Sequence, residues 1–326
     1  MLLPVGGVDL RAMRGSGTRV MPIDLSKFSG ARPDHSLDLL FIHHSTGGHW
    51  LADPGPEEGV DPGMERPPRP ACIYKTHPNG GGLRKALEEQ GYTVNEASYR
   101  SRIGQDTDII HWPPKFRDQM EQILTCQRQD TSLPSGRRNR IVMFKSCYPN
   151  NWFVGPGTPP GRADGPEKTV ANAKAAYSVL LGYFEQHPDV LFVCVTAPPL
   201  APRIEPEPLW KAAARRILGK PSPSLGEHSL HSGRLAREFN NWLKARNGWL
   251  KDYPHPNVVV FDYYDILTRE GESDWSKYPT GDGFDSHPSS EGQRIATAKF
   301  IPFLNRAVRR AGLVELLTQT TDRPPA

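Results

Sequence analysis

The sequence predicts a three-layer, doubly wound α/β fold in which helices cover both faces of a five-stranded parallel sheet. Apolar bursts rich in β-branched residues recur at long intervals along the 326 residues, and segments with helical periodicity separate them. Most bursts are continuous rather than alternating, as is typical of strands that are buried on both faces. Strand and helix alternate five times, which indicates a parallel sheet with right-handed crossovers.

Five segments are expected to form the strands of this sheet. They are LDLLFI at 37–42, YTVNEA at 92–97, RIVMFK at 140–145, VLFVCVT at 190–196 and NVVVFD at 257–262. Apolar side chains at three- and four-residue steps predict helices between them, around 83–91, 116–124, 173–184 and 235–243. The last helix is expected to begin at Ser290, because Ser290 and Gln293 have the spacing of a capping box.

We expect one α/β domain over residues 36–315, with an N-terminal arm at 1–35 and a C-terminal tail at 316–326. Three loops rich in Gly and Pro interrupt the domain after predicted strands, at 51–80, 153–168 and 197–228. Ligands bind at the carboxyl ends of the strands in open α/β sheets, so these loops are expected to form the walls of a site. The alternative is that they are surface insertions without a function.

Composition excludes several classes of protein. The chain has 40 Lys and Arg against 36 Asp and Glu, a formal net charge of +4, which is too small to indicate a nucleic-acid partner. No apolar run approaches the roughly 18–20 residues of a membrane span. No export signal is visible, so the sequence as it stands predicts a cytoplasmic protein, or an exported one whose signal has been removed. The four cysteines form no CxxC pair, which argues against a thiolate zinc site.

A serine and a histidine stand where a catalytic pair could form. The first strand leads into HHSTGGHW, which places Ser45 beside two glycines at the carboxyl end of the strand. The fifth strand is followed by GDGFDSHPSSEGQ, in which Asp285 lies two residues before His287. His287 would take the proton of Ser45 and Asp285 would orient the imidazole while the serine oxygen attacks an ester carbonyl. The alternative is that Ser45 caps a helix and His287 is a turn residue.

Further hydrogen-bond donors are expected at the same edge of the sheet. Asn150 and Asn151 follow the third strand in KSCYPNNW, where a side-chain amide could stabilise an oxyanion by about 3 kcal/mol. Gly104 lies on the loop after the second strand, where its backbone N–H could approach the same oxygen. The alternative for either asparagine is a turn residue.

Taken together, these motifs resemble those of the SGNH, or GDSL-like, hydrolases over roughly residues 37–310. The resemblance implies a flavodoxin-like sheet of five parallel strands and ester hydrolysis through an acyl-enzyme, without a metal or an organic cofactor. It assigns the nucleophile to Ser45, the oxyanion donors to Gly104 and to Asn150 or Asn151, and the acid and base to Asp285 and His287.

Two positions depart from the usual pattern of that family. His43 and His44 precede the serine where Gly-Asp is usual, as in its more divergent branches. The acid usually stands three residues before the histidine, a position occupied here by Phe284. Asp285 is therefore the expected acid, with Asp282 as the alternative.

Two other kinds of chemistry are possible in principle. Histidines and carboxylates are plentiful near these motifs, but His43 and His44 are adjacent on an extended segment and point to opposite sides, so they are not expected to share an ion. We therefore expect no catalytic metal. Cys147 is conceivable as a nucleophile at the end of the third strand, although the sequence suggests no histidine partner close to it.

The expected substrate is an O-acetyl or other short-chain acyl ester on a small carbohydrate or a polysaccharide. Long polar loops and tryptophans near the strand ends favour such a ligand over a long lipid chain, and possible substrate-binding residues are His44, Trp50 and Trp152. Lipid and aryl esters are alternatives. A further alternative is a non-catalytic carbohydrate-binding protein whose tryptophans, among them Trp112 and Trp210, stack on sugar rings.

Overall fold

The computed structural model describes residues 20–54, 76–77, 79–202 and 227–315. The first 19 residues of the expected arm, the expected tail at 316–326, and most of the loops at 51–80 and 197–228 lie outside the described residues. Cys72 and Trp210 belong to those undescribed parts. Among the helices of the described ranges, none combines the length and apolar character needed to cross a membrane.

A seven-stranded sheet with the order β6-β5-β4-β1-β7-β8-β9 forms the centre of the molecule. Its five longest strands are parallel neighbours and coincide with the five expected segments, so the predicted α/β fold is confirmed. The expected number of strands is wrong, because β5 and β6 extend one edge and are too short to leave a periodic pattern. The strands are β1 (Leu37–Ile42), β4 (Tyr92–Ala97), β5 (Cys126–Arg128), β6 (Thr131–Ser132), β7 (Ile141–Lys145), β8 (Leu191–Val195) and β9 (Val258–Phe261).

The order of the strands marks where a ligand should bind. Counted along the chain, the five parallel strands lie in the order 2-1-3-4-5, so the direction of winding reverses between β1 and β7. In such sheets the crevice at the carboxyl ends of the strands on either side of this reversal is the usual ligand site. The residues that follow Ile42 and Lys145 therefore lie at this crevice.

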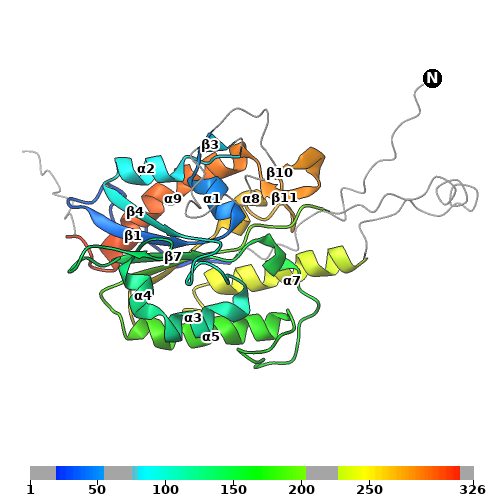
Figure 1. Ribbon diagram of the computed structural model, residues 1–326. Coiled ribbons are helices and arrows are strands. Elements are labelled where there is room, and N and C mark those ends of the chain that lie inside the picture. The colour runs from blue at the N-terminus through cyan, green and yellow to red at the C-terminus, as the bar shows by residue number, and fades with distance from the viewer. Residues whose placement is uncertain (1–19, 55–75, 78, 203–226, 316–326) are drawn as a thin grey trace, which may run out of the picture.

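Helices cover both faces of the sheet (Figure 1), with α1, α2, α8 and α9 on one face and α3, α4, α5 and α7 on the other. Alternate side chains of β1 enter the two cores: Leu40 and Ile42 join the core on the α5 side, and Leu39 and Phe41 join the core on the α9 side. This double burial explains why the strand is apolar throughout. The helices are α1 (Ser45–Leu51), α2 (Leu83–Glu89), α3 (Trp112–Asp118), α4 (Met120–Thr125), α5 (Val170–Glu185), α7 (Glu227–Lys244), α8 (Tyr263–Leu267) and α9 (Ser290–Arg310).

Two local expectations are corrected. The single helix expected around 116–124 is two helices, because Gln119 adopts a non-helical conformation between α3 and α4. The cap of α9 is Ser289 rather than Ser290, since the Ser289 side chain accepts the N–H of Gly292. Gln293 does not close a capping box, because its side chain instead accepts a hydrogen bond from the buried Tyr263 hydroxyl.

Residues 20–35 lie over the domain and contact its core. Leu25 is buried and Ile23 and Phe28 pack against the core on the α9 side. The guanidinium of Arg309 on α9 donates to the backbone carbonyls of Ser29, Ala31 and Arg32. One buried side chain therefore fastens the arm to the last helix.

We expect Arg309→Met to lower the free energy of unfolding by about 2 kcal/mol, because the arm carbonyls would lose a buried donor. Arg294→Met on the exposed face of α9 is the matched control and should change it by less than about 0.5 kcal/mol. Urea unfolding followed by circular dichroism measures both. Equal values for the two variants would show that Arg309 does not fasten the arm.

Candidate active site

Ser45 is the first residue of α1 and lies just beyond the carboxyl end of β1. The helix folds closely over His43, and a Cβ atom at Gly47 would lie only 2.4 Å from the Cβ of His43. Glycine at this position therefore permits the turn that presents Ser45 to the crevice. The serine is 9% exposed, so its hydroxyl is largely shielded from solvent.

His287 approaches the same serine from the other end of the chain. It lies in β11 (Asp285–Pro288), which pairs antiparallel with β10 (Pro279–Thr280) directly before α9. Its Nε2 is 3.3 Å from Ser45 Oγ, and its Nδ1 is 2.7 Å from Asp285 Oδ1. The structure thus brings together the three residues expected from their positions at the strand ends.

The charge of Asp285 fixes the orientation of the histidine. Partial burial alone would raise the pKa of this carboxyl, but hydrogen bonds from the ring and the backbone N–H of His287 outweigh it and lower the pKa to about 2. The carboxylate is therefore ionised throughout the neutral range and accepts the proton on Nδ1 of His287. In the neutral ring Nε2 is then the acceptor nitrogen, and it faces the Ser45 hydroxyl.

Other rings hold His287 in place. The Tyr148 ring lies edge-on to it at a centroid distance of 5.1 Å, and the His49 ring is also 5.1 Å away. His49 in turn stacks on His77 at 3.9 Å. Burial is the largest cause that lowers the pKa of both His49 and His77, so both rings are neutral at pH 7, and His49 packs against His287 as an uncharged surface.

A second polar group touches Ser45 from beneath. The Sγ atom of Cys147, just after β7, lies 3.2 Å from Ser45 Oγ and 3.3 Å from Thr46 Oγ1. Lys145, which is fully buried, donates to Thr46 Oγ1. Cys147 was conceivable from the sequence as a nucleophile, and its contact with Ser45 was not expected. The parallel pairing of β1 with β7 explains the contact, because it aligns the ends of these two strands.

Neither asparagine amide, each expected as an oxyanion donor, is directed to Ser45, because both donate to loop acceptors. The amide nitrogen of Asn150 donates to Asp108 Oδ1 at 2.8 Å and to the carbonyl of Cys147 at 3.3 Å. That of Asn151 donates to both carbonyls of 197–198, at 3.0 and 2.9 Å. Both amides therefore use their two N–H donors to fasten loops to one another.

The backbone N–H of Gly104 is also occupied, because it donates to Ser101 Oγ at 3.0 Å. Its carbonyl accepts a hydrogen bond from His44 Nε2 at 2.7 Å, and the His44 ring stacks on Tyr99 at 3.9 Å. Burial lowers the pKa of His44 to about 4, so this ring is neutral and fastens the Gly104 loop. The N–H of Ser45 itself donates to the Tyr99 hydroxyl at 3.2 Å.

The two tryptophans expected to bind substrate have different surroundings. Trp50 is completely buried and its indole N–H donates to Thr297 Oγ1, so its ring is not exposed for the contact with substrate that was expected of it. Trp50 lies five residues after Ser45 on α1 and faces the sheet rather than the crevice. Trp152 is half-buried and lines a groove of about 520 Å³ together with Tyr148 and Leu200.

The backbone around Asp282 forms a short turn, but the side chain of this alternative acid is not among the described residues. Within the described ranges, no group of three or more His, Cys, Asp or Glu side chains is arranged to hold a metal ion.

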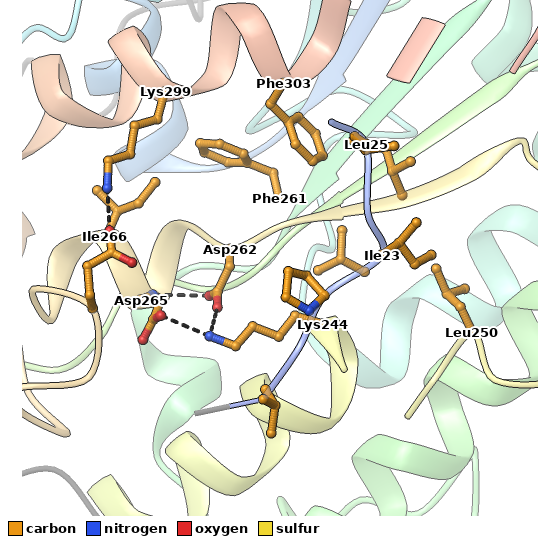
Figure 2. Close-up of a pocket in the computed structure, with 15 residues that line it drawn as sticks. Ile23, Leu25, Lys244, Leu250, Phe261, Asp262, Asp265, Ile266, Lys299 and Phe303 are labelled. Atoms are coloured by element: carbon orange, nitrogen blue, oxygen red, sulfur yellow. Dashed lines mark hydrogen bonds and ion pairs between the residues drawn. The ribbon is translucent and has the colours of Figure 1, made fainter. Parts of the chain in front are cut away.

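A separate pocket of about 360 Å³ lies at the edge strand β9, and none of the candidate active-site residues described above lines it. Figure 2 shows Lys244 on its floor, with Nζ 2.6 Å from Asp262 Oδ2 and 2.9 Å from Asp265 Oδ2. Burial raises the pKa of Asp262, and the Lys244 charge opposes this. The apolar walls come from the arm, β9 and α9, and include Ile23, Leu25, Phe261 and Phe303.

Known proteins resemble this chain only distantly. No model of a protein family and no curated protein matches its sequence. Among solved structures, it is similar to a carbohydrate esterase family 2 enzyme with a carbohydrate-binding domain from Corynascus thermopiles (Myceliophthora fergusii), at 14% identity and a TM-score of 0.37 over 86% of this chain and 67% of the other. It is also similar to a family two carbohydrate esterase from Clostridium thermocellum in complex with cellohexaose, at 12% identity and a TM-score of 0.32 over 85% of this chain and 64% of the other. At these values the similarity assigns neither a substrate nor active-site residues to this chain.

Gly47→Ala should reduce the free energy of unfolding by about 1–3 kcal/mol, because the added methyl overlaps His43 and displaces the start of α1. Gly182→Ala in α5 is the matched control. Its Cβ would meet open space, and replacing a helical glycine should stabilise the protein by about 0.5–1 kcal/mol. Urea unfolding measures both changes, and a stabilising effect at Gly47 would contradict the close approach.

Proposed function

We propose that this protein is a serine esterase in which Ser45 is the nucleophile, His287 the general base and Asp285 the orienting acid. The observation that carries the proposal is the position of His287. One ring nitrogen is 3.3 Å from the Ser45 hydroxyl and the other is 2.7 Å from the Asp285 carboxylate. A nucleophile, a base and a group that orients the base are the recurring parts of such a site on unrelated folds.

The first half of the reaction forms an acyl-enzyme. Ser45 Oγ attacks the carbonyl carbon of the ester while its proton passes to Nε2 of His287. Asp285 stabilises the resulting imidazolium through the Nδ1–H hydrogen bond, and its low pKa keeps it ionised while it does so. The tetrahedral intermediate then collapses, and the imidazolium gives its proton to the departing alcohol.

The second half releases the acid. A water molecule takes the place of the alcohol, His287 removes its proton, and the water oxygen attacks the acyl carbon on Ser45. In both halves the carbonyl oxygen becomes negatively charged and needs donors. With the asparagine amides and the Gly104 N–H already bonded, the Ser45 N–H would serve by exchanging the Tyr99 hydroxyl for the substrate oxygen.

For the substrate, we propose a short acyl ester, such as an O-acetyl group, on a carbohydrate. Tyr148 packs edge-on to His287 and also lines the groove that contains Trp152, so this groove begins beside the proposed base. Aromatic side chains give a sugar ring a flat apolar surface, while Glu167 and Lys168 on the same groove provide polar contacts for its hydroxyls.

The test of the nucleophile is labelling with a small fluorophosphonate, followed by peptide mapping. We expect one adduct on Ser45, which is lost in His287→Ala, and a fall in kcat of at least about 10³-fold for Ser45→Ala. His255→Ala is the matched control, because this histidine lies on the surface beside Glu185 and should leave labelling unchanged.

An unlabelled protein that is folded by circular dichroism would contradict the esterase proposal and favour a carbohydrate-binding protein without catalysis. An adduct on another serine would place the nucleophile elsewhere.

Trp152→Ala tests the substrate class. Removal of the indole should raise KM for an acetylated xylo- or cello-oligosaccharide about threefold to tenfold, the range expected for one aromatic contact. The KM for p-nitrophenyl acetate should be unchanged, because its alcohol is too small to need the groove. KM is measured from initial rates. Equal changes in KM for both substrates would show that the groove does not bind the carbohydrate.

A further inference from the structure

The proposed reaction leaves a buried cation without a role. Lys145 ends β7, and its side chain is completely buried beneath Ser45. Its ammonium donates to Thr46 Oγ1 and to the backbone carbonyl of Ser146. Burial is the largest influence on its pKa and lowers it, and the ionisable neighbour that opposes this is Cys147. A buried ammonium is costly unless a negative group lies near it, so the sulfur of Cys147 is its counterpart.

The contacts of the sulfur suit a thiolate. Two hydroxyls, Ser45 Oγ at 3.2 Å and Thr46 Oγ1 at 3.3 Å, can both donate to Cys147 Sγ. Burial alone would raise the pKa of this thiol, but the charge of Lys145 and the two hydroxyl contacts outweigh it and lower the pKa below its ordinary value. Thiolates rather than thiols react with oxidants and electrophiles.

The other described cysteines have the opposite environment. Cys126 and Cys194 are buried and free of disulfides, as Cys147 is. Burial raises the pKa of Cys126 to about 12 and also raises that of Cys194, so both are held as unreactive thiols. Cys126 and Cys194 therefore serve as internal controls for the effect of Lys145 on the pKa of a buried thiol.

We propose that Cys147 is an oxidation site for hydroperoxides and that its oxidation blocks Ser45. A small peroxide would reach the sulfur by the same route as a substrate reaches Ser45, because Cys147 Sγ lies 3.2 Å from Ser45 Oγ and both residues are 9% exposed. The oxidation itself does not depend on the esterase proposal, whereas the loss of activity rests on it.

The chemistry is a two-electron transfer. The Cys147 sulfur attacks one peroxide oxygen, an S–O bond forms, and the O–O bond breaks. Hydroxide, or an alkoxide from an organic peroxide, leaves and takes a proton from water. The sulfur is oxidised to sulfenic acid and the peroxide is reduced. An added dithiol reduces the sulfenic acid: its first sulfur displaces water to form a mixed disulfide, and its second sulfur releases Cys147 as a thiol while the dithiol is oxidised to its own disulfide.

The new oxygen would disable the nucleophile because of where it must lie. The sulfur is already in hydrogen-bond contact with Ser45 and Thr46, so an oxygen on Sγ has to occupy space beside the Ser45 hydroxyl. It would add a further acceptor for that hydroxyl beside His287 and the sulfur, and it would take up space that a substrate carbonyl needs to approach Ser45 Oγ.

The first experiment measures oxidation without reference to activity. Protein with Cys72→Ser, which leaves the three described cysteines, is treated with hydrogen peroxide and dimedone, and the peptides are mapped by mass. We expect Cys147 to be labelled at least about tenfold faster than Cys126 or Cys194, a ratio that corresponds to one unit of pKa. Equal labelling of the three, or none at Cys147, would overturn the proposal.

The role of Lys145 is tested by pH. Alkylation of Cys147 by iodoacetamide in the unmutated site should have a midpoint below that of glutathione measured in parallel, and in Lys145→Met the midpoint should move upwards. A midpoint at or above that of glutathione would show that no thiolate is stabilised there. Because this first comparison needs no variant at Lys145, a failure of Lys145→Met to fold leaves the proposal testable.

The effect on Ser45 is read from fluorophosphonate labelling before and after peroxide. We expect labelling to fall in the starting protein and in Cys126→Ser, and to return after treatment with dithiothreitol. In Cys147→Ser, peroxide should leave fluorophosphonate labelling at the level of the same variant before treatment. A loss of labelling in Cys147→Ser, or full labelling of protein whose Cys147 is oxidised, would overturn the block. Absence of labelling before any peroxide would count against the esterase proposal only, since the oxidation is measured by mass.

Discussion

The parallel pairing of β1 with β7 is the interaction on which the candidate site depends. Its register sets Leu39 opposite Ile141 and Ile42 opposite Phe144, so the two strands end side by side. Ser45 follows one end and Cys147 follows the other, and their side chains meet because the winding of the sheet reverses between these strands. A slip of one residue in either strand would turn its apolar side chains to the wrong core and separate the two groups.

The fold could be predicted from the sequence because strands that are buried on both faces appear in it as continuous apolar runs. Each of the five parallel strands needs apolar side chains for two cores, and that requirement appears as continuous apolar runs. The pairing of Ser45 with His287 could be anticipated for the same reason, since both follow strand ends that a parallel sheet places at one edge. β5 and β6 only extend one edge of the sheet. They are too short to show a run of apolar residues, so the sequence did not predict them.

The hydrogen-bond donors of the site could not be predicted from the sequence. The sequence places an asparagine at a strand end but does not show which acceptors its side-chain amide bonds to. Asn150 and Asn151 stand where sequence reasoning sought an oxyanion donor, yet loops at 108 and 197–198 take up their N–H groups. Trp50 is a similar case, since its position on α1 is near the nucleophile in sequence while its ring faces the sheet. Proximity along the chain places a residue near a site but does not turn its side chain towards it.

The complete burial of the Lys145 side chain was not expected from the sequence, and it bears on the function of the site. At the end of an apolar strand a lysine would ordinarily extend its ammonium into water, and here the side chain is completely buried. Burying a cation costs several kcal/mol unless nearby negative charge and hydrogen bonds compensate for it. Lys145 donates to Thr46 and to a backbone carbonyl, and the proposed negative charge on the Cys147 sulfur would supply the rest of the compensation, so the stability of the core and the state of the proposed nucleophile depend on the same few atoms. A change in the charge of that sulfur therefore cannot be confined to the core, because the hydroxyl of Ser45 is one of its hydrogen-bond partners.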